Sequence, residues 1–239
     1  MENAVYVGLS QQTAMRRELD IVANNLANMN TSAFKAEHML FHEFLVKAGA
    51  KEPVSFVEDY GVVRDMSEGR LESTNNPYDV AITGPGFLAV DTKAGTRYTR
   101  NGHLRLGPDG QLVTESGLPV LDDRLRPITL NARDGQPTIA DDGTISNASG
   151  TVAKLDMVQF ENNQALTKQG NGLFSTDQTP LPADKSHLQQ GMVEGSNVEP
   201  IREMTRMMDV LRTYETTQNM VQTDSNRQKM AIERLAKFS

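Results

Sequence analysis

The chain has 239 residues, 24 basic and 31 acidic side chains, and a formal net charge of −7. Its length suffices for one or two domains with a hydrophobic core, and 38% hydrophobic with 23% charged residues is a globular composition. The acidic balance and the 5% aromatic content argue against a nucleic-acid binder. No window approaches the roughly 20 apolar residues of a membrane span. The absence of cysteine excludes disulfides, thiolate metal sites and cysteine nucleophiles.

The N-terminal segment has the pattern of a long helix. From Val5 to Met29 apolar residues recur at alternating steps of three and four, and no proline interrupts the run. At 1.5 Å per residue, about 25 residues would form a helix roughly 38 Å long. The first residues lack the basic start and apolar run of a secretory signal, so we expect any export to leave the N-terminus in place.

Residues 36–75 are predicted to form a linker or an extended arm, because glycines and prolines are scattered through them. His38 and His42 stand four residues apart on an expected short helix, a spacing that can place two imidazoles on one metal ion. No glutamate follows the first histidine and no third ligand is nearby, so a packing or surface role is favoured. The sequence predicts no metal and no cofactor.

Residues 76–192 are predicted to form a central antiparallel β domain. Turn signals such as Asn101-Gly102 and Asp109-Gly110 recur there, with short β-type runs between them, including residues 87–90. Residues 48–198 contain 13 basic and 20 acidic side chains and therefore carry the whole net charge. This partition suits nearly neutral, packed ends and an acidic, solvated centre.

Two acidic pairs in this region, Asp122-Asp123 and Asp141-Asp142, raise the question of catalysis. Glycosidic acid/base chemistry needs two carboxylates across a cleft. Both pairs lie in turn contexts, where aspartate is favoured because its side chain bonds the nearby backbone. No Gly-x-Ser-x-Gly elbow is present either. The sequence therefore predicts turns here, and no enzyme.

The C-terminal zone, residues 193–239, predicts a second, longer helix. Ser196 and Asn197 are N-cap types, and Pro200 suits a first helical turn. From Ile201 to Phe238 neither glycine nor proline occurs, so the helix could reach roughly 57 Å. Such a helix cannot bury its apolar stripe alone. We therefore predict an α+β fold in which the N- and C-terminal helices form a coiled-coil-like pair, with the antiparallel β domain between them in sequence.

Three ordered motifs resemble those of bacterial flagellar rod and hook proteins. ANNLANMNTSAFK at residues 23–35 is similar to the N-terminal signature of that family, and EGSNVEPI at residues 194–201 to its C-terminal signature. NNPYDVAITGPGF at residues 75–87 and YTRNG at residues 98–102 resemble its β domain. Ala33 stands where the family often has glycine, which argues against a required left-handed turn at this position.

The resemblance implies a structural subunit rather than an enzyme. Within the family, the short chain and its N-terminal start look most like the proximal rod subunits, and the distal rod subunits are the alternative. The implied location is the rod of the flagellar basal body, in the periplasmic space, after type III export without a cleaved signal peptide. The rod is a hollow drive shaft that transmits torque and passes exported subunits. A soluble binding module that dimerises through a coiled coil is the alternative from another class.

The partners that the resemblance implies are copies of the chain itself, proximal rod subunits below, the distal rod protein above, and the export apparatus. Residues 1–35 and 193–239 would be the polymerisation segments. Their expected interface residues are Val5, Met15, Leu19, Val22, Asn24, Asn25, Leu26, Asn28, Met29, Phe34, Met204, Met207, Leu211, Tyr214, Val221, Ile232 and Leu235.

Overall fold

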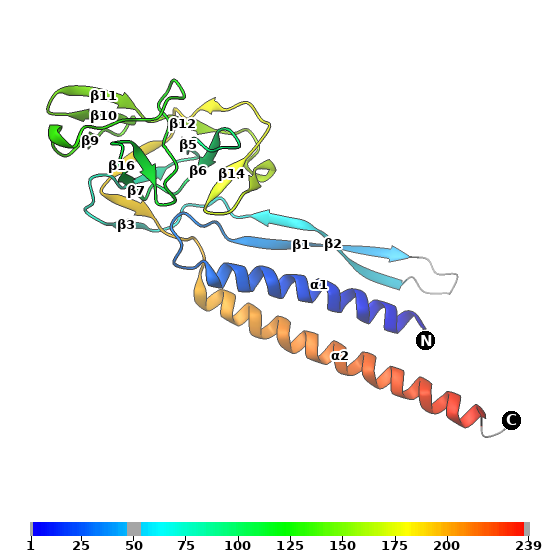
Figure 1. Cartoon of the computed structure of the whole chain (residues 1–239). Coiled ribbons are helices and arrows are strands. Elements are labelled where there is room, and N and C mark those ends of the chain that lie inside the picture. Colours follow the sequence, from blue (N-terminus) through cyan, green and yellow to red (C-terminus); the bar gives the residue numbers. More distant parts are fainter. Residues whose placement is uncertain (1, 47–53, 237–239) are drawn as a thin grey trace. The chain divides into compact units, whose positions relative to one another are not determined.

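The computed structural model describes residues 2–46 and 54–236, and the chain divides into two compact units. The first is a helical unit built from helix α1 (Glu2–Ala27), strands β1 (Glu37–Val46) and β2 (Val54–Arg64), and helix α2 (Pro200–Ala236). Helix α1 lies between the β1–β2 hairpin and α2 (Figure 1), and it contacts all three elements. The two helices run antiparallel, since Gly8 faces Val221 and Asn25 bonds Glu203.

The predicted coiled-coil-like pair is wrong, although two terminal helices and central antiparallel strands are present as in an α+β protein. Helix α1 packs on α2 and on the hairpin at once, so its buried surface is not a two-helix seam. On α2 the buried positions are Glu203, Val210 and Thr217, whereas the predicted Met204 and Leu211 are 47% and 42% exposed. The apolar spacing placed the buried row of α2 one residue too far toward the C-terminus, because two of the three residues that are actually buried are polar.

The two helices approach each other closely at Gly8. A Cβ atom added to this glycine would lie 2.6 Å from Cγ2 of Val221. Valine is stiff at χ1, so its methyl group cannot easily move aside. The missing side chain of Gly8 therefore lets α1 and α2 approach closely enough to pack.

Strands β1 and β2 form an antiparallel hairpin, with Met39 opposite Val62 and a register shift between Leu40 and Phe41. The expected short helix at His38 and His42 is therefore wrong: both residues lie in β1. The physical reason is pairing, since a valine-rich partner strand lies opposite, which local spacing does not reveal. Residues 47–53, which belong to the predicted linker or arm, lie outside the described residues.

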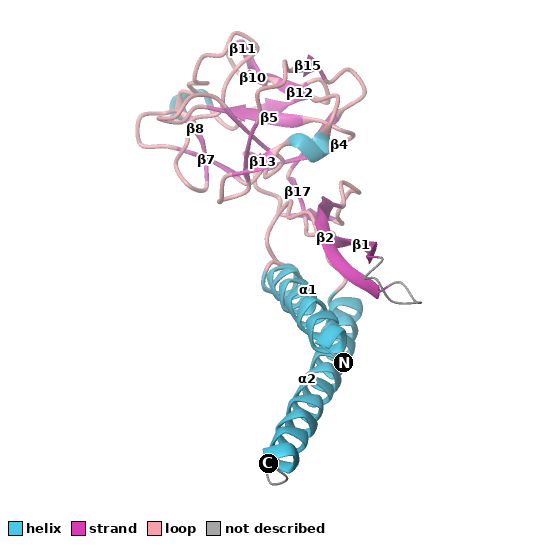
Figure 2. Cartoon of the chain, turned by 90° about the vertical axis from the view of Figure 1, so that its right-hand side faces the viewer, coloured by secondary structure: helices cyan, strands magenta, loops and turns pink. Residues whose placement is uncertain are grey.

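The second unit, the β unit, comprises residues 28–36 and 66–197. Its strands pair antiparallel throughout, in one six-stranded sheet of order β13-β14-β6-β5-β12-β15, one three-stranded sheet of order β11-β10-β9 and the pairs β16-β4, β17-β3 and β7-β8. Figure 2 draws the strands in magenta and the loops that join them in pink. The bounds are β3 (Leu71–Ser73), β4 (Val80–Thr83), β5 (Phe87–Val90), β6 (Arg97–Thr99), β7 (Leu104–Leu106), β8 (Leu112–Thr114), β9 (Thr138–Ile139), β10 (Thr144–Asn147), β11 (Gly150–Lys154), β12 (Met157–Gln159), β13 (Thr167–Lys168), β14 (Leu173–Ser175), β15 (Leu181–Pro182), β16 (His187–Gln190) and β17 (Met192–Glu194).

Two hydrophobic clusters fill the β unit. The larger is aliphatic and joins β4 and β5 to the later strands, with Ile82, Leu88 and Leu188 at most 1% exposed. The smaller is aromatic, with Phe160 packed at an angle against Phe87 at 5.8 Å between ring centroids. Neither helix of the described chain combines the length and the apolar character of a membrane span.

The contact between Gly8 and Val221 gives a double-mutant test. Gly8→Ala should destabilise the helical unit in the Val221 background, and Val221→Ala should remove most of that cost because it clears the space. We expect a coupling energy on the order of 1 kcal/mol from chemical unfolding followed by far-ultraviolet circular dichroism. Thr13→Ala, on the exposed side of α1, is the matched control and should not couple to Val221→Ala. Independent, additive effects of Gly8→Ala and Val221→Ala would contradict the close approach.

Candidate assembly interface

The buried amide of Asn25 joins three elements of the helical unit. Its Nδ2 donates to the carbonyl oxygen of Glu37 at 2.8 Å and to Oε2 of Glu203 at 3.1 Å. Its Oδ1 accepts a hydrogen bond from the Glu37 amide at 3.0 Å. Both donors and the acceptor are therefore used, which fixes the start of β1 and the first turn of α2 against the end of α1.

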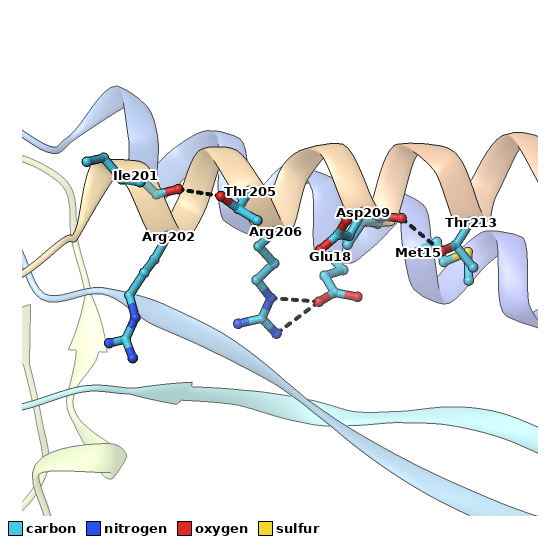
Figure 3. Close-up of a pocket in the computed structure, with 9 residues that line it drawn as sticks. Met15, Glu18, Ile201, Arg202, Thr205, Arg206, Asp209 and Thr213 are labelled. Carbon is cyan, nitrogen blue, oxygen red and sulfur yellow. Dashed lines mark hydrogen bonds and ion pairs between the residues drawn. The ribbon is translucent and has the colours of Figure 1, made fainter.

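Arg206 of α2 forms a second polar link in the same unit (Figure 3). Two nitrogens of its guanidinium, Nε and Nη2, each lie 2.9 Å from Oε1 of Glu18 on α1. The third nitrogen lies 3.2 Å from Nδ1 of His38 on β1. Because a guanidinium only donates, Nδ1 of His38 accepts. His38 thus has a packing role here, and no cluster of three potential metal ligands occurs among the described residues.

In the β unit, Glu194 is the centre of a buried ion cluster. One carboxylate oxygen lies 2.6 Å from Nζ of Lys35 and the other 2.9 Å from Nε of Arg100, and all three side chains are at most 2% exposed. Arg100 also donates to the carbonyl oxygens of Gly84 and Ile82. Burial lowers the pKa of the Lys35 amine, while the Glu194 carboxylate acts to raise it. Both cations of the cluster therefore depend on the Glu194 carboxylate as their bonded counter-charge.

The N-terminal and C-terminal signatures meet beside this cluster. The amide of Ala33 donates to the Glu194 carbonyl oxygen at 2.7 Å, and the Ala36 amide donates to Oδ1 of Asn197 at 2.8 Å. Ala33 has φ of 56°, so the argument from its side chain against a left-handed turn was wrong. The hydrogen bond to Glu194 helps hold the backbone in a conformation that costs a non-glycine residue about 1–2 kcal/mol.

The structure places the predicted interface residues in very different surroundings. Val22, Asn25 and Phe34 are buried, with Phe34 under Nζ of Lys168 at 4.4 Å from the ring centroid. The half-buried members are Met15, Leu19, Leu26, Asn28, Met29, Met207, Tyr214 and Val221, and the exposed ones are Asn24, Met204 and Leu211. For Val5, Ile232 and Leu235 the description extends to the helix backbone only.

Sequence reasoning missed the polar residues that organise these contacts. Lys35 and Glu194 stood inside the recognised motifs, and Arg100 in the motif YTRNG, without any role assigned to them. Glu203 lies outside the apolar spacing that predicted the interface of α2, so no role was assigned to it either. The one available signal was that the charges fall within motifs at both ends of the chain, which suggests pairing but names no partners.

The acidic pairs close turns. Oδ1 of Asp122 accepts hydrogen bonds from the amides of Arg124 and Arg126 at 2.9 and 2.8 Å, and its Oδ2 lies 2.7 Å from the Arg126 guanidinium. Although burial raises the pKa of Asp122, these bonds hold it below its ordinary value. Asp142 accepts from the amide and hydroxyl of Thr144, and these bonds lower its pKa.

Asp156 is the exception among the carboxylates near these turns. Burial, together with the charges of Asp123 and Asp122, raises its pKa to about 6. No hydrogen bond or ion pair to its side chain occurs within the described part of the chain. This carboxyl is therefore destabilising when it is ionised in the folded protein.

Family models match three successive parts of the chain. Residues 5–35 match "Flagella basal body rod protein", residues 81–150 match "Flagellar hook protein FlgE/F/G D1 domain", and residues 189–234 match "Flagellar basal body rod FlgEFG protein C-terminal". The two outer matches contain the signatures that meet at Glu194, and the middle one lies in the β unit. The fold and its buried signature contacts therefore define a flagellar rod or hook subunit.

Comparison with full-length relatives narrows the class from rod or hook subunits to rod subunits. The chain is 40% identical to flagellar basal-body rod protein FlgF of Caulobacter vibrioides and 36% identical to FlgF of Mesorhizobium japonicum, with 100% of each chain covered. It is 29% identical to flagellar basal-body rod protein FlgG of a Buchnera aphidicola subspecies, over 95% of this chain and 98% of the relative. The chain belongs to the flagellar basal-body rod protein family and is a structural subunit of the rod. The predicted resemblance is thereby confirmed.

Removing the charge of Glu194 should destabilise the β unit strongly. Glu194→Gln leaves Lys35 and Arg100 buried without an anion, and breaking a buried pair in this way costs roughly 3–5 kcal/mol. Lys35→Met in the same chain should recover part of the loss because it removes one uncompensated charge. Urea unfolding of the full chain measures both effects, and Glu115→Gln on an exposed turn is the neutral control. Wild-type stability of Glu194→Gln would contradict the role of the cluster.

The raised pKa of Asp156 predicts a pH dependence of stability. Between about pH 4 and pH 6 the folded chain retains a proton on Asp156 that the unfolded chain loses, so this carboxyl makes stability fall as the pH rises. Asp156→Asn should therefore gain stability relative to wild type across this window, by at most about 3 kcal/mol. Asp142→Asn, whose carboxyl has a lowered pKa, should show the opposite sign. Thermal unfolding of the three proteins at pH 4 and pH 7 provides the comparison; a pH-independent difference between Asp156→Asn and wild type would exclude this titration.

Proposed function

We propose that this subunit assembles, through surfaces of its two terminal helices, into the hollow shaft of the rod, in contact with copies of itself and with neighbouring rod proteins. The observation that carries the proposal is the uneven distribution of apolar side chains. In the described helical unit, the buried ones are Ala14, Val22, Met39, Val198 and Val210. The same unit exposes many others, including Tyr6, Leu9, Ile201, Met204, Met208, Leu211, Met220 and Met230.

Neighbouring subunits are the energetically favoured partners of these exposed side chains. Covering one Leu, Ile or Met contributes roughly 1.5–3 kcal/mol, whereas ordering each residue of a helix costs about 1–2 kcal/mol for the backbone alone. A helix pair with only a few buried side chains gains little by itself. Contacts repeated along a row of subunits supply the missing burial, so helix order and assembly would be coupled.

The position along the shaft is proposed from the relatives. The two more similar relatives named above are FlgF proteins, and the FlgG relative is less similar. We therefore favour the proximal rod over the distal rod, with proximal rod subunits on one side and the distal rod protein on the other.

Export as an intact chain through the flagellar type III apparatus into the periplasm belongs to the same proposal. The support is the family membership of the chain. A helix pair with few buried apolar side chains among its described residues also suits passage through a narrow channel, because little packing must be undone.

Leu211→Asp tests assembly through the helices. A charge at this exposed apolar position should abolish swimming when the variant is the cell's sole copy, because a charged group buried between subunits is strongly unfavourable. The variant should be absent from purified basal bodies, whereas the wild-type chain should be recovered from them at its full 26.4 kDa.

The control is Thr216→Asp, which adds the same charge at another exposed position of α2. It should leave motility near the wild-type level. The purified Leu211→Asp chain should keep the thermal unfolding transition of the β unit, which separates an assembly defect from misfolding. Motile cells with normal basal bodies carrying Leu211→Asp would refute assembly through this surface.

A further inference from the structure

Helix α2 presents an apolar ridge over its first turns. Ile201, Met204, Met208 and Leu211 are 82%, 47%, 52% and 42% exposed. Their spacing of three, four and three residues places them along one line of the helix surface. Further along the same line stand Glu215, Gln218 and Gln222, so the ridge is short and has a defined end. We call these four residues the ridge.

The neighbouring flank of α2, with Ile201 at its border, forms one wall of a groove. A hollow of about 530 Å³ lies between α1 and α2, at the same level of α2 as the ridge. Met15 of α1 and Val210 of α2 contribute apolar atoms to it, and Glu18 and Arg206 form an ion pair within it (Figure 3).

The polar groups of the groove are largely satisfied inside the chain. The hydroxyls of Thr205 and Thr213 donate to carbonyl oxygens of their own helix at 2.9 and 2.8 Å, and Arg202 pairs with Glu199. An occupant therefore need not supply many polar partners. The groove suits apolar side chains, which is the chemistry that the ridge presents.

We propose that the ridge of one copy packs into the groove of the next copy. This inference rests on the proposed function, because it assigns the surfaces through which the rod subunits meet. Ile201 borders the groove as well as the ridge, whereas the other three ridge residues do not line the groove. Ridge and groove therefore occupy neighbouring flanks of one helix at the same height, so a lateral step brings them together. Such a contact is heterologous, and it adds subunits in a row instead of closing a two-fold dimer.

Charge supports this choice of partner. Asp209 lines the groove, and Arg212 borders the ridge one turn beyond Met208. Both side chains are exposed, and neither forms an ion pair with another residue of the described chain. Seating the ridge in the groove brings Arg212 of one copy toward Asp209 of its neighbour, since the two positions differ by only about 4.5 Å along the axis.

Disulfide trapping in cells tests the arrangement, and the natural chain contains no cysteine that would interfere. One full-length variant carries Met208→Cys in the ridge and another carries Thr205→Cys in the groove. Cells that produce both, and no wild-type chain, should give a disulfide-linked dimer in purified basal bodies after mild oxidation. Each variant alone should give none. Asn226→Cys, on the flank of the ridge but about 27 Å farther along α2, is the control partner for Thr205→Cys.

The other outcomes separate the two proposals. A dimer from Met208→Cys alone would mean that ridges meet each other, and would overturn the ridge-in-groove contact. Basal bodies that contain both variants without any disulfide would also overturn it while leaving the rod function intact. If the wild-type chain is itself absent from purified basal bodies, the assembly proposal fails.

Charge exchange gives a second readout. Asp209→Arg and Arg212→Asp should each reduce the swimming diameter at least twofold when present alone. Cells that produce both variants as separate chains should recover, because the new carboxylate on the ridge of one copy then meets the new guanidinium in the groove of the next. Pairing within a single helix predicts no recovery, since each chain still carries two like charges. Motility no better than with either variant alone would therefore overturn the proposed charge contact.

Discussion

The fold of the β unit depends on one carboxylate that holds distant parts of the chain together. Glu194 pairs with Lys35 from the N-terminal signature and with Arg100 from the central region, 159 and 94 residues away in sequence. All three side chains are removed from water, so leaving any one of them unpaired is strongly unfavourable. The two signatures therefore fold as one structural feature, and the β unit contains residues from both sides of the β1–β2 hairpin in sequence.

A similar constraint operates in the helical unit through neutral and charged hydrogen bonds. Asn25 is saturated by Glu37 and Glu203, and it therefore fixes the register of α1 against both β1 and α2. Replacing these polar residues by apolar ones would give a longer apolar seam and more ways to slide. The buried polar residues leave fewer apolar side chains at the helix interface, but they fix one alignment of the helices. This use of buried polar residues is well attested at helix interfaces.

The features predicted correctly from the sequence are those that a local pattern of residues determines. The two long helices follow from uninterrupted spacing, and the antiparallel strands follow from turns such as Asp109-Gly110. Sequence reasoning failed where the outcome depends on a distant partner. The strand at His38 requires the opposing β2, the buried row at Glu203 requires Asn25, and the left-handed Ala33 is bonded to Glu194. The same limit applies to the interface: periodicity identified Leu211 as apolar, but only the structure reveals that it is exposed.

The unequal helices indicate where the helical unit is least complete. Helix α1 has 26 residues and α2 has 37, so about 16 Å of α2 has no counterpart of equal length. Near its end Met230 is 54% exposed, and Arg227, Lys229 and Arg234 give it a basic character. The contact between Gly8 and Val221 in antiparallel helices places the start of α1 opposite about residue 227 of α2, because both helices rise by 1.5 Å per residue. The last turns of α2 therefore extend past α1 in this unit. In the proposed assembly a neighbouring subunit would cover them, so the unequal lengths of the two helices support a contact between copies at this end of α2.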